Sequence, residues 1–211
     1  YGNEHNLPIT PIYKDVVELY AQTRIAYTPT LLVTYGGPWA ENYFFTKEEV
    51  HDDQKVRRFI PDNVIQKMTR RRQWFRDDEY SFSKFAADAA KIIRAGGRVG
   101  VGSHGQLQGL GFHWELWALH SGGLTEMEAL RAATIGGAEI IGISSDIGSL
   151  EVGKLADFII LNEDPLEDIK NTNDIKYVVK NGRLYNAEMM DQIWPKKEKL
   201  SELWWWNNEA P

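Results

Sequence analysis

Residues 82–103 read FSKFAADAAKIIRAGGRVGVGS, and this stretch decides the fold. Apolar side chains recur every three or four positions in its first part, which predicts a helix. They are Phe82, Phe85, Ala86, Ala89, Ile92 and Ile93. Gly96 and Gly97 end this helix, and a glycine-punctuated strand over 98–103 follows at once. A helix, a tight glycine turn and a short buried strand in this order indicate an α/β fold with parallel strands.

The same alternation of helix and strand is expected on the N-terminal side. Thr10-Pro11 reads as an N-cap followed by proline at the first helical position, which predicts a helix over about 11–23. The apolar, β-prone run 25–33 predicts a buried strand that ends in the loop Gly36-Gly37-Pro38. Pro29 lies inside this run and cannot donate to a sheet ladder, which weakens the assignment.

Beyond about residue 145 the pattern changes to short β-prone runs. Strands are predicted over 157–161 and 175–180, and Asn181-Gly182 joins the second of them to another run at 183–185. Asn-Gly between two such runs is a strong hairpin signal. We therefore expect an α/β portion over 1–145, antiparallel strands over 146–187 and a charged tail over 188–211.

The composition limits the class of protein. Of 211 residues, 43% are hydrophobic and 12% aromatic, which is enough for a packed core. The formal net charge of -6 disfavours a nucleic-acid binder, which needs a concentrated basic surface. No cysteine is present, which excludes disulfides, thiolate-bound zinc and thiol nucleophiles. No apolar run approaches the roughly 18 residues that a membrane span needs.

Two segments raise the question of a macromolecular partner. The stretch 57–76 is rich in arginine and reads either as an anionic binding patch or as a solvated helix face. The acidic run Asp77-Asp78-Glu79 balances it nearby and favours the solvated face. Trp204-Trp205-Trp206 near the C-terminus is expected to dock on this chain's own surface rather than on a partner.

Five histidines are the main candidates for chemistry: His5, His51, His104, His113 and His120. His104 follows the strand at 98–103, and active sites of parallel α/β folds are built at strand C-terminal ends. The alternative is a core histidine satisfied by a hydrogen bond. His113 precedes Trp114-Glu115-Leu116-Trp117, where it either orients a substrate or packs. No nucleophile elbow, P-loop or dinucleotide fingerprint is present, which disfavours serine hydrolases, nucleotide hydrolases and Rossmann enzymes.

Several motifs in chain order resemble the end of metal-dependent amidohydrolases. GSHG at 102–105, the following HWEL and GLTEMEALRAAT at 123–134 resemble the last barrel strand and its helix. GSLEVGKLADF at 148–158 resembles the family's return to a small β-sandwich. YTPTL at 27–31 is similar to the seventh strand and EHN at 4–6 to the end of the sixth. The resemblance covers about residues 1–187 and points to the imidazolonepropionase-like and prolidase-like branch, including members fused to a Tol-type β-propeller.

The resemblance implies the C-terminal part of a (β/α)8 TIM barrel, strands 6–8, followed by strands of a small β-sandwich. Such a barrel holds one or two divalent metals, usually zinc, at its strand ends. Family ligands come from the first, fourth, fifth, sixth and eighth strands. His5 falls on the sixth-strand histidine, and His104 on the eighth-strand aspartate, which gives His104 both a metal-binding and a catalytic assignment. Tyr35, Gln106 and His113 follow strand ends and are assigned to the substrate pocket.

Two departures from the family pattern stand out. The eighth-strand aspartate both ligates metal and accepts a proton from water, whereas His104 carries no negative charge. No aspartate between Asp88 and Asp146 replaces it. The first five strands are also missing, because about 145 residues hold three strands while a closed barrel takes about 250 residues. The chain therefore reads as the C-terminal piece of a larger enzyme, inactive by itself.

The resemblance implies hydrolysis of a C–N bond in a small amide or dipeptide substrate, with no nucleic-acid or membrane partner. The alternative is a degenerate, non-catalytic relative that serves as a binding or assembly module. A half-barrel leaves strand edges and apolar surface open, which predicts self-association or pairing with a missing N-terminal half. Membership of the propeller-fused branch would imply a periplasmic or extracellular location.

Overall fold

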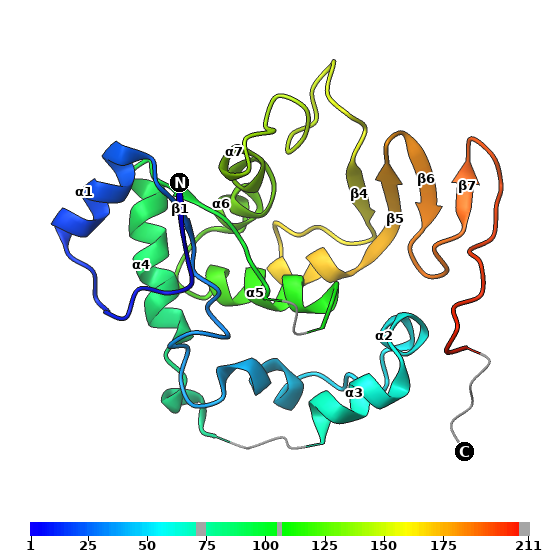
Figure 1. Cartoon of the computed structure of the whole chain (residues 1–211), viewed down its shortest axis with the longest axis horizontal. Helices are drawn as coiled ribbons and strands as arrows, with labels where there is room; N and C mark the ends of the chain where they lie inside the picture. The colour runs from blue at the N-terminus through cyan, green and yellow to red at the C-terminus, as the bar shows by residue number, and fades with distance from the viewer. Residues whose placement is uncertain (71–74, 105–106, 207–211) are drawn as a thin grey trace.

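The computed structural model describes residues 1–70, 75–104 and 107–206, and it contains two separate sheets (Figure 1). The first sheet is parallel and has the order β1-β2-β3. Its strands are β1 (Gly2–Glu4), β2 (Ala26–Thr28) and β3 (Arg98–Val99). Glu4 pairs with Thr28, and Tyr27 pairs with Val99. Since all three strands run the same way, their carboxyl ends lie at one edge of the sheet.

The parallel strands are shorter than the sequence predicts. β2 stops at Thr28 instead of continuing to residue 33, because Pro29 offers no N–H and Thr30 has a φ of 53°. The amides of Val33 and Thr34 both donate back to the Thr30 carbonyl at 3.2 Å, so the chain forms a turn. We call residues 30–34 the Thr30 turn. β3 likewise ends at Val99, and the amide of Gly100 still donates to the Tyr27 carbonyl at 3.0 Å.

Helices connect the parallel strands in the predicted order. α1 (Lys14–Thr23) links β1 to β2 and starts later than expected, with the extended residue Tyr13 as its N-cap. α4 (Phe82–Arg94) leads into β3, and its end confirms the glycine stop, with the Gly97 amide donating to the Ile92 carbonyl at 2.9 Å. The helix–glycine–strand unit that opens the sequence argument is therefore present in the structure.

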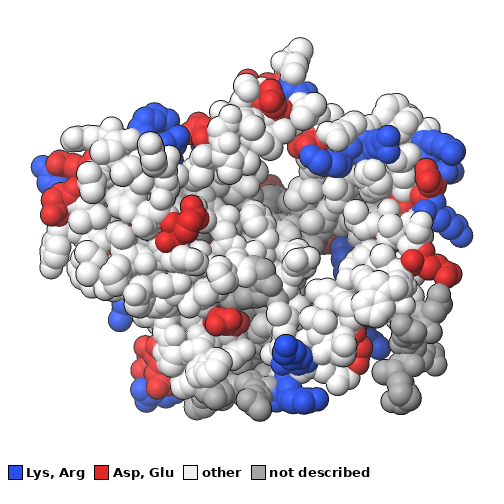
Figure 2. All heavy atoms as spheres, viewed as in Figure 1, with Lys and Arg blue, Asp and Glu red and all other residues white. Residues whose placement is uncertain are grey.

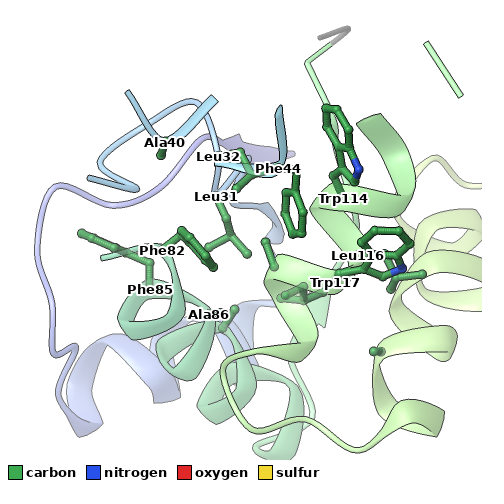
Figure 3. Close-up of a cluster of buried hydrophobic side chains, with 14 of the residues drawn as sticks. Leu31, Leu32, Ala40, Phe44, Phe82, Phe85, Ala86, Trp114, Leu116 and Trp117 are labelled. Atoms are coloured by element: carbon green, nitrogen blue, oxygen red, sulfur yellow. The ribbon is translucent and has the colours of Figure 1, made fainter. Parts of the chain in front are cut away.

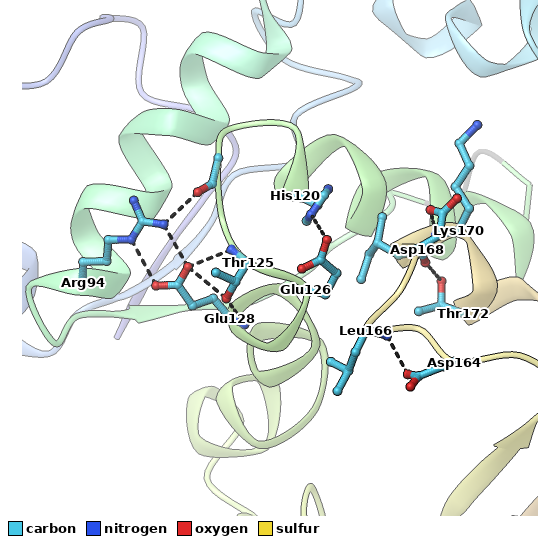
Figure 4. A network of polar contacts seen from close by, with 12 residues as sticks. Arg94, His120, Thr125, Glu126, Glu128, Asp164, Leu166, Asp168, Lys170 and Thr172 are labelled. Atoms are coloured by element: carbon cyan, nitrogen blue, oxygen red, sulfur yellow. Dashed lines mark hydrogen bonds and ion pairs between the residues drawn. The ribbon is translucent and has the colours of Figure 1, made fainter.

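A series of helical segments follows β3. α5 (Leu110–His120) is almost completely buried in its middle turns. The spacing of Thr125 and Glu128 predicts a capping box, and α6 (Glu126–Arg131) begins with it: the two residues exchange side-chain and backbone hydrogen bonds. A π-helical turn (Ala132–Gly136) and α7 (Gly137–Ile140) continue it. Figure 4 shows the capping box with Arg94 of α4 joined to Glu128.

The charged segment between β2 and α4 forms short helices at the lower side of Figure 1. They are η1 (Ala40–Asn42), η2 (Phe44–Thr46), α2 (Gln54–Phe59), α3 (Asp62–Thr69) and η3 (Asp77–Glu79). Several of its basic residues have partners: Arg76 pairs with Asp78 at 3.2 Å, and the Arg58 guanidinium lies 4.2 Å from the Trp206 ring centroid. Basic and acidic side chains are interspersed on the face in Figure 2. Arg71 and Arg72 lie outside the described residues.

The tryptophan-rich segment docks on the chain's own surface, as expected. The indole N–H groups of Trp205 and Trp206 both donate to the carbonyl of Arg58, at 3.2 and 2.7 Å. Together with the stacking of Arg58 on Trp206, these bonds fasten the C-terminal segment to α2.

The second sheet is antiparallel with the order β4-β5-β6-β7. Its strands are β4 (Phe158–Leu161), β5 (Ile175–Lys180), β6 (Arg183–Asn186) and β7 (Gln192–Trp194), and η5 (Ile169–Asn173) lies between β4 and β5. The hairpin at Asn181-Gly182 is confirmed, with Lys180 opposite Arg183. β7 lies within residues 188–211, which the sequence analysis treats as a tail, so the sheet continues into that segment.

The core joins the charged segment to α5 (Figure 3). Phe44 stacks on Trp114 with ring centroids 5.6 Å apart, and Phe45 meets the same indole edge-on at 4.8 Å. Leu31 and Leu32 of the Thr30 turn are completely buried beside them. Each such side chain contributes about 1.5–3 kcal/mol on burial. The Thr30 turn, the charged segment and α5 therefore form one packed unit at the carboxyl edge of the parallel sheet.

Candidate functional site at the strand ends

Each parallel strand is followed by a non-glycine residue in the left-handed region of φ. His5 comes directly after β1 with a φ of 70°, Thr30 after β2 with 53°, and His104 after β3 with 51°. This conformation costs of order 1–3 kcal/mol for such residues and concentrates at functional sites. Three strained residues at three neighbouring strand ends mark this edge of the sheet as a candidate site.

The structure brings His5 and His104 together although 99 positions separate them in the sequence. Their ring centroids lie 5.3 Å apart, with the ring planes at 62°. The His5 amide donates to the Thr28 carbonyl at 2.7 Å, which extends the hydrogen-bond ladder between β1 and β2 by one bond. This bond fixes the backbone position of His5, from which its ring extends. The sequence assignment of both residues to one site thus has a matching geometry.

Glycines let β3 and its continuation lie close to β2. A Cβ on Gly102 would come within 2.5 Å of the Thr28 side chain, and one on Gly100 would meet Ile140 at 2.9 Å. A larger residue at position 102 would push the chain away from β2, and one at position 100 would displace the end of the Ile140 side chain. The Gly100-Val101-Gly102 stretch therefore lets the chain carry His104 to the strand ends beside His5.

The His5 ring is oriented through its Nδ1 atom. The Thr34 hydroxyl lies 3.4 Å from this atom, and the Asn6 side-chain amide donates to the Thr34 carbonyl. The Asn6 oxygen accepts a hydrogen bond from the Tyr27 hydroxyl at 3.4 Å. In the tautomer whose Nδ1 proton is donated to Thr34, Nε2 is free to act as a ligand or to accept a proton.

The donor set fits part of a metal site. Two imidazoles that ligate one tetrahedral zinc through bonds of about 2 Å have ring centroids about 5 Å apart, close to the spacing of His5 and His104. Imidazole nitrogen also suits zinc chemically. Over residues 1–70, 75–104 and 107–206, no three histidine or carboxylate side chains gather into one metal-binding group. Catalytic zinc takes three protein ligands, so this pair fits as a portion of a larger set.

Glu115 is the residue near the site that the sequence analysis leaves without a role. It lies in the middle of α5, is 2% exposed, and accepts hydrogen bonds from the amides of Leu31 and, at 3.2 Å, Leu32. Burial raises the pKa of Glu115 to about 7, against the opposing effect of these two amide donors. The only sequence signal for Glu115 is an acidic residue inside an apolar helical segment. Its hydrogen-bond partners, Leu31 and Leu32, lie more than eighty positions upstream.

The substrate-pocket candidates lie in different surroundings. The His113 Nδ1 atom lies 3.2 Å from the Thr172 hydroxyl, where α5 meets η5, and burial together with Lys55 lowers the pKa of His113 to about 4. Tyr35 is 54% exposed and stacks on Phe85 of α4 at 6.3 Å. Gln106 lies outside the described residues. Their assignment to the substrate pocket stays a prediction.

The chain belongs to the Amidohydrolase family, whose model matches residues 46–185. The match includes His104 and the whole of α5, the capping box and the β4–β6 hairpin region. No helix in the described part of the chain is long and apolar enough to cross a membrane.

Curated relatives match shorter stretches. Imidazolonepropionase from Symbiobacterium thermophilum is 60% identical over 40 residues, which is 19% of this chain and 9% of that protein. Ochratoxinase from Aspergillus niger is 39% identical over 75 residues, or 34% of this chain and 16% of that protein. The aligned stretches therefore span well under a fifth of these relatives.

Solved structures share the fold over most of the chain. A Xaa-Pro dipeptidase crystallised with methionine in its active site has a TM-score of 0.55 at 23% identity, covering 87% of this chain and 39% of the dipeptidase. The A. niger ochratoxinase structure gives a TM-score of 0.55 at 24% identity, covering 87% of this chain and 36% of that enzyme. The chain spans about two fifths of the length of these folds.

Proposed function

We propose that this chain is the C-terminal part of a metal-dependent amidohydrolase that hydrolyses a C–N bond. In this proposal β1, β2 and β3 are strands 6–8 of a (β/α)8 barrel, and β4–β7 belong to the small β-sandwich. The observation that carries the proposal is the meeting of His5 and His104 at the carboxyl ends of parallel strands. Membership of the amidohydrolase family and the hydrolase names of its relatives support it.

His5 and His104 are the residues that would hold a divalent cation, zinc by the chemistry of their donors. The remaining ligands would come from strands that this chain does not contain. Such an ion, when bound, lowers the pKa of a water molecule and polarises the scissile carbonyl. Thr34 would keep the His5 ring oriented by accepting the Nδ1 proton, and Nε2 would then be available for ligation.

His104 takes the position where the family carries an aspartate. A neutral ring nitrogen of His104 ligates or accepts a proton without adding negative charge to the site. The site would therefore have one negative charge fewer than an aspartate-containing relative. We propose small amides or dipeptides as substrates, with Tyr35, Gln106 and His113 in the pocket.

The alternative is a non-catalytic relative that serves in binding or assembly. The histidine at position 104 and the lack of a third donor among the described residues favour it. Metal-dependent turnover distinguishes the two functions, because the enzyme hydrolyses substrate with a bound metal and the binding module does not.

The test is metal content and turnover of the full-length gene product, with its upstream sequence. His5→Ala and His104→Ala should each lower zinc affinity and turnover at least tenfold, whereas His120→Ala should change neither. His120 is a matched control because its ring pairs with Glu126 at 3.3 Å on α5 and α6 (Figure 4). A metal-free native protein without hydrolase activity would support the binding module instead. Full turnover in both site variants would remove His5 and His104 from the site.

A further inference from the structure

A buried carboxylate links α5 to the Thr30 turn. Glu115 sits between Trp114 and Leu116, both of which are almost completely buried in the core (Figure 3). Burying a carboxylate in such surroundings costs several kcal/mol unless hydrogen bonds compensate. Its oxygens accept hydrogen bonds from two consecutive backbone amides, those of Leu31 and Leu32. A leucine would fill the same space without the desolvation cost, so the carboxylate contributes as an acceptor rather than as packing.

The two amides are the first ones of the Thr30 turn. The Thr30 carbonyl accepts from Val33 and Thr34, so the turn begins like one turn of a helix. The amides at such a start have no acceptor inside the turn. Glu115 supplies that acceptor from a distant element, as an N-cap side chain does locally. The hydrogen bonds from the Leu31 and Leu32 amides to Glu115 therefore fix the start of the Thr30 turn to α5.

The other end of the Thr30 turn touches the candidate site. The Thr34 hydroxyl lies 3.4 Å from Nδ1 of His5, and the Thr34 carbonyl accepts the side-chain amide of Asn6, the next residue after His5. A shift of the turn would move Thr34 away from the His5 ring. A continuous set of contacts thus connects Glu115 to His5 through fewer than five residues of backbone.

We propose that Glu115 is a positioning residue for the candidate metal site, holding the Thr30 turn so that Thr34 orients the His5 ring with Nε2 free. This inference rests on the proposed function for the use of His5 as a ligand. The orientation of the ring itself is a property of this chain and can be measured without metal.

The test compares four variants of the 211-residue chain by NMR and by titration with zinc alone. Glu115→Leu removes the acceptor, Glu115→Gln keeps one acceptor oxygen, and Thr34→Val removes the contact to His5 but not the turn. Leu119→Ala is the matched control, because Leu119 is equally buried on α5 and its side chain makes no hydrogen bond.

Glu115→Leu should shift the Leu31 and Leu32 amide protons upfield and should abolish the preference of the His5 ring for one tautomer. It should also weaken zinc binding about tenfold, the usual loss when an outer-shell partner is removed. Thr34→Val should change the His5 tautomer ratio while leaving both amides in place. Leu119→Ala should lower Tm and leave the His5 ring signals unchanged.

The inference is overturned if Glu115→Leu lowers Tm as Leu119→Ala does and leaves the His5 tautomer ratio at its native value. If Glu115→Leu does not fold, Glu115→Gln decides by the same ring signals, with a partial loss of tautomer preference expected. If the native chain binds no zinc while the ring signals respond as predicted, the positioning role of Glu115 stands, and zinc binding by the full-length gene product decides the metal assignment of His5.

Discussion

At the residue scale, the charge state of Glu115 couples stability to pH. Burial raises its pKa to about 7 from an ordinary value of 4.5, so the folded chain holds a proton there that the unfolded chain releases. This contribution to stability is complete below pH 4.5 and is lost as the pH rises through 7, by ~3 kcal/mol in total. Tyr27 is a titratable neighbour of Glu115, and burial keeps the pKa of Tyr27 far above this range.

Urea unfolding of the native chain and of Glu115→Gln at pH 5 and pH 8 checks this prediction. The native free energy of unfolding should fall between the two values by more than that of the variant, since glutamine does not titrate. Equal pH dependence in both proteins would show that Glu115 is ionised throughout, with its two amide bonds outweighing the desolvation.

Sequence reasoning reaches some of these residues and misses others for a physical reason. His5 and His104 are both named as candidates because family motifs surround them, and His104 also because it follows the strand predicted over 98–103. Glu115 and Thr34 are missed, because their roles exist only through contacts with residues 84 and 29 positions away. Spacing along one element carries no information about such pairs.

At the element scale, the start of α6 is held by more than the capping box that its sequence predicts. Glu128 also binds Arg94 of α4 through two oxygens, at 3.0 and 2.9 Å. Arg94 and then the Thr125 amide lower the pKa of Glu128 to about 2, so this stabilisation is present above pH 4.5 and is lost as the pH falls through 2.

We expect Glu128→Ala and Thr125→Ala each to lower the free energy of unfolding by about 1 kcal/mol at pH 7. The double variant should lose less than the sum of both, because the two side chains bond each other. Urea melts of the two single variants and the double variant give the coupling energy. Strict additivity would mean that Glu128 acts through Arg94 alone.

The contact between α5 and η5 depends on one hydroxyl. Thr172 donates to the Ile169 carbonyl at 2.7 Å and accepts from the Trp117 indole at 3.1 Å, so the His113 ring must donate its Nδ1 proton to the remaining lone pair. Thr172→Val should cost about 1–3 kcal/mol, because the buried donors of His113 and Trp117 lose their acceptor.

Thermal unfolding measures that loss, with Thr172→Ser as the matched control. Serine keeps the hydroxyl and should retain most of the native stability. The His113 nitrogen signals should show the Nδ1-protonated tautomer in the native chain and in the serine variant, and a mixture in the valine variant. An unchanged Tm in Thr172→Val would assign the contact to packing alone.

At the scale of the whole molecule, the order of the α/β and antiparallel parts follows from the sequence, and the strand lengths do not. The change from helix–strand units to Asn-Gly hairpins predicts two sheets, and two sheets are present. β2 is shorter than its apolar run because Leu31 and Leu32 are buried from a turn rather than from a strand. An apolar run predicts that its residues are buried. It does not predict the left-handed backbone at Thr30 and His104, where the strands no longer continue.

The isolated chain is expected to be inactive as a hydrolase. Two imidazoles leave a divalent cation with too few protein donors for a catalytic site. Assays of amide and dipeptide hydrolysis with added zinc should show background rates only, while the full-length gene product turns over. Metal-dependent turnover by the 211 residues alone would show that they hold a complete site.

We further expect the chain to associate with itself through its parallel sheet. β1 and β3 are the outer strands among those described, and each has one edge without a neighbouring strand, an arrangement that invites pairing with another chain. The driving force is smaller than the sequence suggests, because Leu31, Leu32 and Val99 are already buried within the chain. Association should therefore be reversible and dependent on concentration.

Light scattering across a range of micromolar concentrations decides this expectation. The apparent mass should rise above 24.2 kDa with concentration. Val101→Lys, at the half-buried continuation of β3, should return the chain to a monomer, since lysine at a strand edge opposes pairing. A melting curve taken alongside must show that the lysine variant is folded. A native chain that stays at monomer mass at every concentration would mean that the helices beside the sheet already protect both edges, and the open half-barrel would have to be abandoned.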